Sequence, residues 1–218
     1  MTDSDSPPYH QDNPTDGHYG RRRVLGTAAG VVGCAGLCAA SWPFLDSLNG
    51  PHSAKGRQTT FEPLDIDLSN LAPGSHRQLT WGNLPVAVTH RTKEQIKALT
   101  QPTLLAQLRD PTSRSRQQPA DCRNPWRSLV PDYGVYVGIC THLGCVTRFR
   151  NLENDPPAGG FFCGCHGSWF DGAGRVLKNV PAAYNLPVPP ATLLAPTMLR
   201  LGRSAADPAF TMASIERM

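Results

Sequence analysis

Two short stretches decide what this chain can fold into: Cys140-Thr141-His142-Leu143-Gly144-Cys145 and Cys163-Gly164-Cys165-His166-Gly167-Ser168. Each stretch holds one cysteine and one histidine at metal-ligand spacing, Cys-x-His in the first and Cys-x-x-His in the second. Two thiolates and two imidazoles suit either a single zinc ion or a 2Fe–2S cluster with both histidines on one iron. Each stretch also carries a spare cysteine. The spare cysteines favour the cluster, because two glycine-rich loops around an asymmetric cluster need to be fastened together. A zinc site and a set of plain disulfides are the alternatives.

The two stretches resemble the ligand motifs of the Rieske iron–sulfur subunits of ubiquinol–cytochrome c reductase, the respiratory cytochrome bc complex. The resemblance extends from Arg21 to about Pro190. It implies one 2Fe–2S cluster per chain and a mainly β fold. That fold is a Rieske-type antiparallel β-sandwich head with an inserted cluster-binding subdomain, preceded by a single N-terminal transmembrane helix. The implied covalent pattern is Cys140 and Cys163 on one iron, His142 and His166 on the other iron, and a disulfide between Cys145 and Cys165.

The resemblance also implies roles for residues around the cluster. Ser168 matches the family's serine donor to a bridging sulfide, whereas Phe170 stands where many high-potential relatives carry a tyrosine that donates to a ligand sulfur. The missing hydroxyl predicts a lower reduction potential than in those relatives. His166 is expected to hydrogen-bond the quinol and Leu143 to share the exposed docking tip with it, so both are assigned to catalysis. The other residues expected at the cofactor are Gly144, Gly167 and Pro181.

Two positions depart from the family's pattern. Gly164 stands where the family usually has a proline between the cysteines of the second stretch. Ala183 replaces a proline in the loop that is expected to cover the cluster. Both changes predict less rigid loops around an otherwise unchanged metal centre.

An uncharged apolar run from Val24 to Leu45 follows Arg21-Arg22-Arg23. As a helix this run would measure about 33 Å, which is enough to cross a bilayer. The arginine run also fits a twin-arginine export signal, a route that carries proteins already folded. We expect an uncleaved anchor in the cell inner membrane, with the N-terminus in the cytoplasm and the head in the periplasm. A signal peptide cleaved after Ala40 is the alternative.

The chain is expected to have four parts. Residues 1–20 are polar and predict a disordered cytoplasmic tail. Residues 21–45 form the twin-arginine signal and anchor, and residues 46–60 form a flexible hinge linker. Residues 61–218 form the Rieske 2Fe–2S head, with its cluster-binding subdomain at about 138–184.

Local patterns in the head predict an antiparallel β domain. The 21 prolines and 20 glycines are typical of a loop-rich chain. Two strand-like runs, 76–81 and 84–90, flank Gly82-Asn83 and predict a hairpin. Thr92-Lys-Glu-Gln95 matches a capping box that opens a short helix. Cys122 has no evident partner and is expected to be a free thiol.

The expected function is electron transfer as a subunit of the quinol–cytochrome c reductase (translocase). By resemblance, the chain takes one electron from ubiquinol, and a proton through a histidine ligand. It passes the electron to the membrane-anchored cytochrome c subunit. Cytochrome b is the other expected partner in this membrane complex, which is expected to be dimeric. The alternative is the Rieske small subunit of a periplasmic molybdenum oxidase such as arsenite oxidase. A net charge of +4, with no basic run beyond Arg21-Arg22-Arg23, gives no reason to expect a nucleic acid partner.

Overall fold

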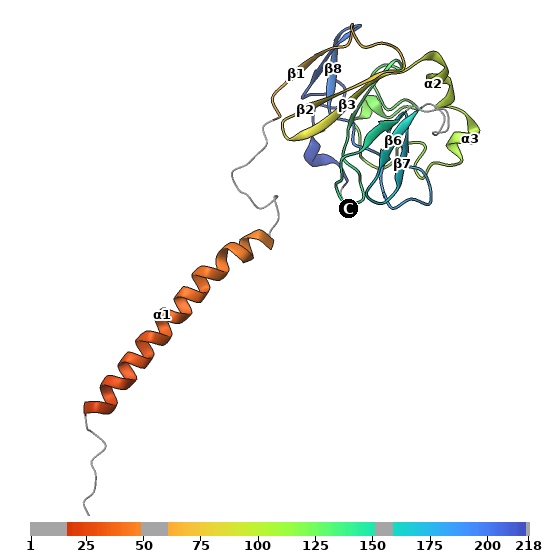
Figure 1. Ribbon diagram of the computed structural model, residues 1–218. Helices are drawn as coiled ribbons and strands as arrows, with labels where there is room; N and C mark the ends of the chain where they lie inside the picture. Colours follow the sequence, from red (N-terminus) through yellow and green to blue (C-terminus); the bar gives the residue numbers. More distant parts are fainter. Residues whose placement is uncertain (1–16, 49–60, 151–158, 217–218) are drawn as a thin grey trace, which may run out of the picture. The chain divides into compact units, whose positions relative to one another are not determined.

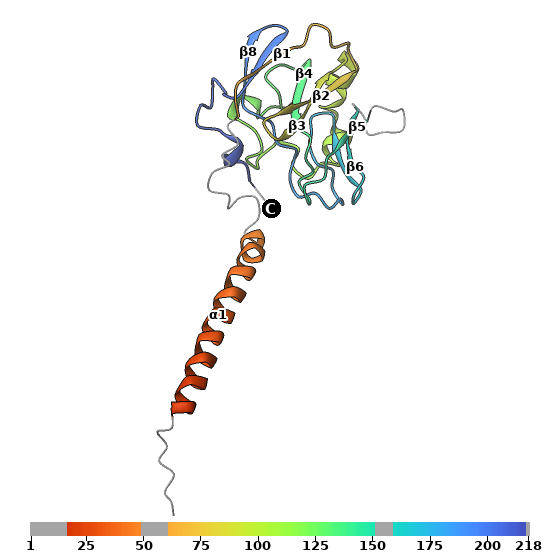
Figure 2. The same ribbon diagram turned by 60° about the vertical axis from the view of Figure 1, so that its left-hand side comes forward.

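The computed structural model describes residues 17–48, 61–150 and 159–216. The chain separates into two units, Met1–Gln58 and Thr59–Met218. The described part of the first unit is a single helix, and the second unit is a β domain (Figures 1 and 2). Most of the expected tail, up to residue 16, and most of the expected hinge, residues 49–60, lie outside the described residues.

Helix α1 spans Gly17–Leu48 and includes Pro43. It is longer at both ends than the predicted anchor, because backbone hydrogen bonding continues through the polar flanks of the apolar run. Residues Gly20–Asp46 are long and apolar enough to cross a membrane. The hydroxyls of Thr27 and Ser41 each donate to the carbonyl four residues earlier. These polar groups are therefore satisfied within the helix, as a bilayer requires.

The second unit contains three antiparallel three-stranded sheets in its described part, ordered β1-β9-β8, β2-β3-β4 and β5-β6-β7. The prediction of a mainly β, antiparallel head after one N-terminal apolar helix is confirmed. The strands are β1 Leu64–Asp67, β2 His76–Trp81, β3 Leu84–His90, β4 Tyr133–Val137, β5 Arg148–Arg150, β6 Gly160–Cys163, β7 Ser168–Asp171, β8 Ala191–Ala195 and β9 Met198–Leu201.

The β2-β3-β4 sheet contributes to a core on each of its faces, because successive side chains of a strand point to opposite sides. Val86 and Val88 of β3 and Val135 of β4 belong to a core shared with the β1-β9-β8 sheet. Ala87 of β3 and Tyr136 of β4 belong to a second core shared with the β5-β6-β7 sheet. The small third sheet is thus packed onto the sandwich by an apolar layer. The buried members of this second core are Ala87, Cys122, Tyr136, Cys140, Phe161, Cys163, Phe170, Val176, Ala182, Leu186 and Val188.

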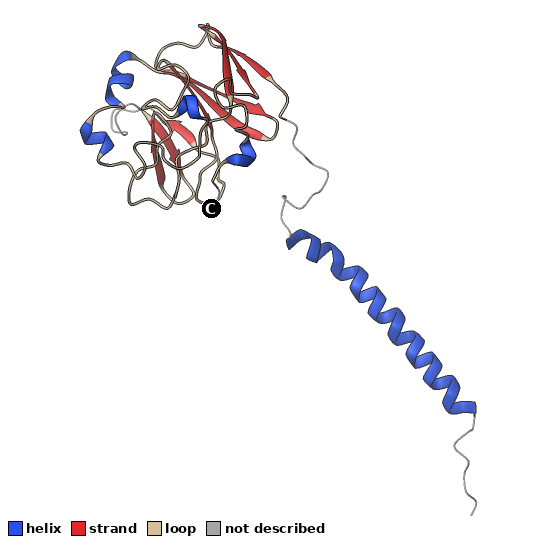
Figure 3. Cartoon of the chain, turned by 180° about the vertical axis from the view of Figure 1, so that it is seen from behind, coloured by secondary structure: helices blue, strands red, loops and turns tan. Residues whose placement is uncertain are grey.

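The local turn and cap signals are confirmed. The hairpin between β2 and β3 turns at residues 82–83, where Gly82 has a φ of 59°. Thr92 caps helix α2 (Lys93–Ala98), and both hydrogen bonds of the capping box to Gln95 are present. The remaining short helices are α3 Pro102–Leu105, η1 Ala120–Cys122 and η2 Met212–Ser214. Figure 3 shows how little of this unit is helical.

Candidate metal centre

The two cysteine-rich stretches form two loops of similar construction. We call residues 140–145 the first ligand loop and residues 163–168 the second ligand loop. The first is closed by the bridge between Ile139 and Val146, and the second connects the paired strands β6 and β7. The N–H of Gly144 donates to the Cys140 carbonyl at 3.0 Å, and the N–H of Gly167 donates to the Cys163 carbonyl at 3.0 Å.

Both loop glycines have positive φ angles, 79° at Gly144 and 75° at Gly167. Residues with a Cβ adopt this region at a cost, so glycine is required for the turn in each loop. The two glycines that were expected beside the cofactor therefore shape the ligand loops through their backbone.

A disulfide joins the two ligand loops. Cys145 and Cys165 are bonded, with their Cα atoms 6.7 Å apart and a sequence separation of 20. The predicted pairing is confirmed. The ligand atoms of Cys145, Cys163 and Cys165 lie within 4.8 Å of one another. They do not form a three-thiolate site, because two of the three sulfurs are bonded to each other.

The remaining loop cysteines, Cys140 and Cys163, are buried free thiols. Burial raises the pKa of the Cys140 thiol, and the neighbouring Cys163 thiol raises it further; the backbone N–H of His142 and the Ser168 hydroxyl oppose the rise. The two sulfurs therefore lie close enough to interact. Two buried thiolates side by side need a cation to offset their charge, and iron would supply it.

The two loop histidines also meet. The rings of His142 and His166 lie edge to face, with their centroids 4.8 Å apart. The Nδ1 atom of His142 is buried and has no hydrogen-bond partner among the described residues. A buried imidazole nitrogen without a partner is unfavourable unless a metal takes that position. The structure therefore fits a cluster with imidazole ligands, and His166 stands exposed beside it.

The loop after β7 is tied to both ligand loops. Ser168 is fully buried, and its Oγ accepts a hydrogen bond from the backbone N–H of Ala182 at 3.0 Å. The hydroxyl of Thr141 donates to the Tyr184 carbonyl at 2.5 Å. Pro181 is exposed next to Ala182. Sequence reasoning did not identify these ties, because they use backbone groups that have no residue signature.

Two further predicted residues differ sharply in exposure. Phe170 is fully buried in the second core. Leu143, at the tip of the first ligand loop, is 69% exposed, and Val146 beside the loop is 56% exposed. Exposed apolar side chains therefore stand in and next to the first ligand loop, whose His142 meets His166.

Comparisons with known proteins identify the domain that contains these loops. Residues 12–50 match the family model described as "Ubiquitinol-cytochrome C reductase Fe-S subunit TAT signal", and residues 117–190 match "Rieske [2Fe-2S] domain". The first match confirms the predicted twin-arginine signal.

Relatives match over most of their length. A protein of Allochromatium vinosum is 45% identical over 190 residues, covering 84% of this chain and 88% of that protein. A protein of Bradyrhizobium diazoefficiens is 35% identical over 191 residues, covering 88% and 96%. Both are named "Ubiquinol-cytochrome c reductase iron-sulfur subunit". A solved chain described as "Hyperthermophilic respiratory Complex III" aligns over 80% of this chain and 98% of its own length, at 22% identity and a TM-score of 0.37. The chain belongs to the family of ubiquinol–cytochrome c reductase iron–sulfur subunits, with a Rieske domain for a 2Fe–2S cluster.

Proposed function

We propose that this chain is the Rieske electron-transfer subunit of a quinol–cytochrome c reductase, with ubiquinol as the electron donor and the membrane-anchored cytochrome c subunit as the acceptor. The observation that carries the proposal is the contact between the rings of His142 and His166. The Nδ1 of His142 is buried without a partner among the described residues, and His166 is exposed. When bound, a 2Fe–2S cluster with two histidine ligands accepts and releases one electron at a potential between about −150 and +300 mV. The proposed ligands are Cys140 and Cys163 on one iron, and His142 and His166 on the other.

His166 is proposed to receive the quinol. Its imidazole is exposed, so a ring nitrogen can hydrogen-bond a hydroxyl of the donor and take its proton. A quinol must lose a proton as well as an electron, and a histidine at the contact point can hold that proton. Leu143 follows His142 in the chain and supplies an exposed apolar side chain, which suits the apolar centre of a docking interface.

The surrounding residues are proposed to shape the metal centre. Ser168 is buried at the end of the second ligand loop and donates its hydroxyl to a sulfur. Phe170 fills the core without a hydroxyl, which lowers the reduction potential relative to tyrosine-bearing relatives. Gly144 and Gly167 turn the ligand loops, and Pro181 lies in the segment beside Ser168.

The proposed topology follows from the signal, the helix and the disulfide. Residues 1–20 form a cytoplasmic tail, residues 21–45 the anchor in the inner membrane, residues 46–60 a hinge, and residues 61–218 the periplasmic head with its cluster-binding subdomain at about 138–184. A structural disulfide suits an oxidising compartment such as the periplasm. The hinge lets the head move between cytochrome b and the cytochrome c subunit, in a complex proposed to be dimeric.

The molybdenum-oxidase alternative is not favoured. The relatives that match most of this chain carry the name of the reductase subunit, and the N-terminal match is to the signal region of that same subunit.

Purification of the full-length chain from membranes tests the function. We expect cytochrome b and a c-type cytochrome to copurify, and the dithionite-reduced protein to give the Rieske EPR signal. Cytochrome c reduction by added ubiquinol should be lost in His166→Ala and kept in His76→Ala, which changes an exposed histidine of β2. A colourless, EPR-silent protein containing zinc would overturn the proposal.

Carbonate extraction and N-terminal sequencing test the topology. An uncleaved anchor keeps the protein in the carbonate-washed membrane with the N-terminal residues intact. A mature N-terminus near Ser41 would instead show that the helix is removed as a signal peptide.

A further inference from the structure

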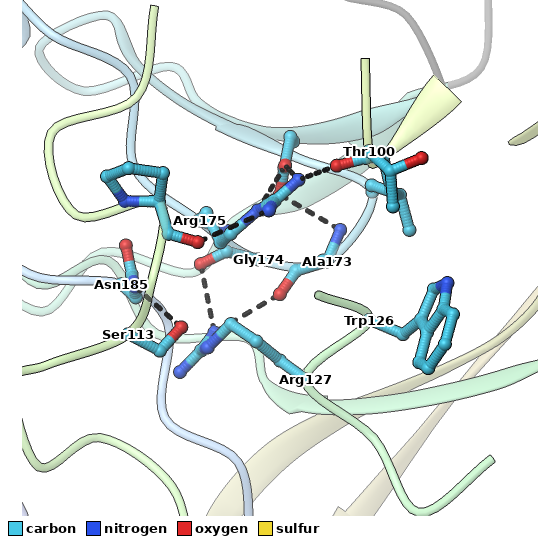
Figure 4. Close-up of polar contacts among 12 residues, drawn as sticks. Thr100, Ser113, Trp126, Arg127, Ala173, Gly174, Arg175 and Asn185 are labelled. Atoms are coloured by element: carbon cyan, nitrogen blue, oxygen red, sulfur yellow. Dashed lines mark hydrogen bonds and ion pairs between the residues drawn. The ribbon is translucent and has the colours of Figure 1, made fainter. Parts of the chain in front are cut away.

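Three arginines are buried in the described part of the head, Arg91, Arg127 and Arg175. Arg91 and Arg127 donate to carbonyls of the turn that follows β7, and Arg175 donates to Asp171 at the end of β7 (Figure 4 shows Arg127 and Arg175). Arg175 forms a fully buried ion pair with Asp171 at 2.7 Å. Arg127 differs from Arg175, because each of its hydrogen bonds goes to a neutral oxygen.

The hydrogen bonds of Arg127 use every N–H of its guanidinium. Nε and Nη2 donate to Gln118 Oε1 at 3.3 and 2.8 Å. Nη1 donates to the carbonyls of Ala173 and Gly174 at 3.1 and 3.2 Å, and Nη2 donates to the Leu186 carbonyl at 2.8 Å. Burial lowers the pKa of Arg127 to about 10, so the side chain stays charged at neutral pH. Burying a charge without a contacting carboxylate costs folding free energy. The presence of Arg127 at this position therefore calls for a structural or functional explanation.

The carbonyls that Arg127 binds mark the two ends of one segment. We call residues 175–185 the cover segment. Gly174 precedes it and Leu186 follows it, and the N–H of Leu186 also donates to the Gly174 carbonyl at 2.8 Å. Gly174 has a φ of 68°, and a Cβ there would lie 3.3 Å from Arg127 Nη1. One guanidinium therefore holds both ends of the cover segment together, at a turn that admits only glycine without strain.

The cover segment leads from Arg127 to the metal centre. Its Ala182 N–H donates to Ser168 Oγ at 3.0 Å. A hydroxyl that accepts this bond on one lone pair keeps its hydrogen for a second partner. Ser168 is fully buried at the end of the second ligand loop, and its hydroxyl lies within hydrogen-bonding reach of the Cys140 thiol. The position of Ala182 therefore sets the direction in which the Ser168 hydroxyl points.

We propose that Arg127 is a positioning residue for the metal centre. It holds both ends of the cover segment and so keeps the Ala182 N–H on Ser168 Oγ. This hydrogen bond directs the Ser168 hydroxyl toward the ligand sulfur. This inference rests on the proposed function in that Cys140 is taken as a ligand. This role depends on the planar guanidinium group with its several N–H donors rather than on the positive charge. A lysine ammonium is a compact point charge and cannot span Gln118, Gly174 and Leu186 together.

Variants of Arg127 in the full-length chain in detergent separate geometry from charge. Arg127→Lys keeps the positive charge and loses the planar set of guanidinium donors, and Arg127→Met loses both. The matched control is Arg200→Met, which removes an exposed arginine that pairs with Asp65 on the β1-β9-β8 sheet. Hydrogen exchange of the Ala182 amide and the midpoint potential are the two measurements.

In both Arg127 variants we expect the Ala182 amide to exchange about tenfold faster or more, because a net hydrogen bond contributes on the order of one tenfold step in an equilibrium constant. The midpoint potential should fall in both, since a misdirected hydroxyl no longer stabilises the more negative, reduced state. Arg200→Met should match the wild type. If Arg127→Met does not accumulate, Arg127→Lys alone decides. Wild-type exchange and potential in Arg127→Lys would overturn the proposal.

The same exchange measurement on cluster-free protein keeps the two proposals apart. Faster exchange at Ala182 in cluster-free Arg127→Lys supports the positioning role even without a metal. A wild-type protein without the Rieske EPR signal would refute the proposed function. It would not affect the conclusion that Arg127 positions the Ala182 amide.

Discussion

The rings of His142 and His166 come from different ligand loops and meet edge to face, with centroids 4.8 Å apart. The loops that carry them are joined by the Cys145–Cys165 disulfide and turned by matching glycines. Two imidazoles brought together by separate loops can share one iron.

The proposed ligand set predicts which histidines are required for the Rieske EPR signal. His142→Ala or His166→Ala should abolish the Rieske EPR signal, because each change removes one of the proposed imidazole ligands of the same iron. Cys140→Ala and Cys163→Ala should do the same. His76→Ala is the control, because His76 is exposed on β2 and stacks on Phe149 with ring centroids 4.8 Å apart. A normal spectrum from any of the four ligand variants would refute the assignment.

The disulfide predicts a measurable loss of stability. The double variant Cys145→Ser/Cys165→Ser should lower the free energy of unfolding by about 3 kcal/mol, the entropic value for a loop of this length. Urea unfolding of the full-length chain, followed by tryptophan fluorescence, measures the change. Cys34→Ala/Cys38→Ala controls for the removal of two cysteines and should leave the head unaffected. An unchanged midpoint in the first variant would mean that the loops are held without the disulfide.

Phe170 predicts a change in reduction potential. Phe170→Tyr places a hydroxyl in a fully buried position of the core that contains Cys140 and Cys163. A hydroxyl that reaches a ligand sulfur should raise the midpoint potential by roughly tens of millivolts, because the reduced state is the better acceptor, and 59 mV corresponds to about 1.4 kcal/mol for one electron. Protein-film voltammetry measures this potential. A lower urea midpoint without a higher potential would show that the hydroxyl is buried without an acceptor, which costs about 1–3 kcal/mol.

Cys122 predicts a loss of stability at alkaline pH. Burial raises the pKa of its thiol from 9.0 to about 12, and Asp121 adds to the rise. The folded state therefore keeps a proton that the unfolded state loses above pH 9. This contribution to stability is complete below about pH 9 and is lost by at most about 1.4 kcal/mol per pH unit as the pH rises toward 12.

Urea midpoints at pH 8, 9 and 10 test this behaviour of Cys122. The wild-type midpoint should fall more steeply with pH than that of Cys122→Ala. The thiol should also resist iodoacetamide at pH 8.5 until the protein unfolds, because the thiolate is the reactive form. Rapid native alkylation of Cys122, shown by mass spectrometry, would contradict the raised pKa.

Local signals explain how much of the fold could be predicted. The hairpin around Gly82 and the cap at Thr92 depend on residues within a few positions of one another, and both are present. The proposed metal donors were predicted from sequence because cysteine and histidine at this spacing have few other uses. The prediction of a free Cys122 is confirmed.

Long-range polar contacts explain what sequence reasoning missed. The stretch from 110 to 124 is mostly polar in sequence, yet Ser113, Gln117 and Gln118 are buried. Gln118 is satisfied by Arg127 and by the Ser113 carbonyl, and only the folded chain places these partners together. Strand β8 was missed because the prolines before it resemble a loop, and its partner β9 comes later in the chain.

The disulfide between Cys145 and Cys165 also has a consequence for the order of cluster insertion, export and oxidation. A twin-arginine substrate is folded before it leaves the cytoplasm, where thiols are kept reduced. The cluster must therefore be inserted while both of these cysteines are still thiols, and the two ligand loops must hold it without a covalent tie. In the proposed topology oxidation follows on the far side of the membrane, so the disulfide forms around a centre that is already built. A chain exported without its cluster would form the disulfide first, and the cluster could then no longer be inserted between two unlinked loops.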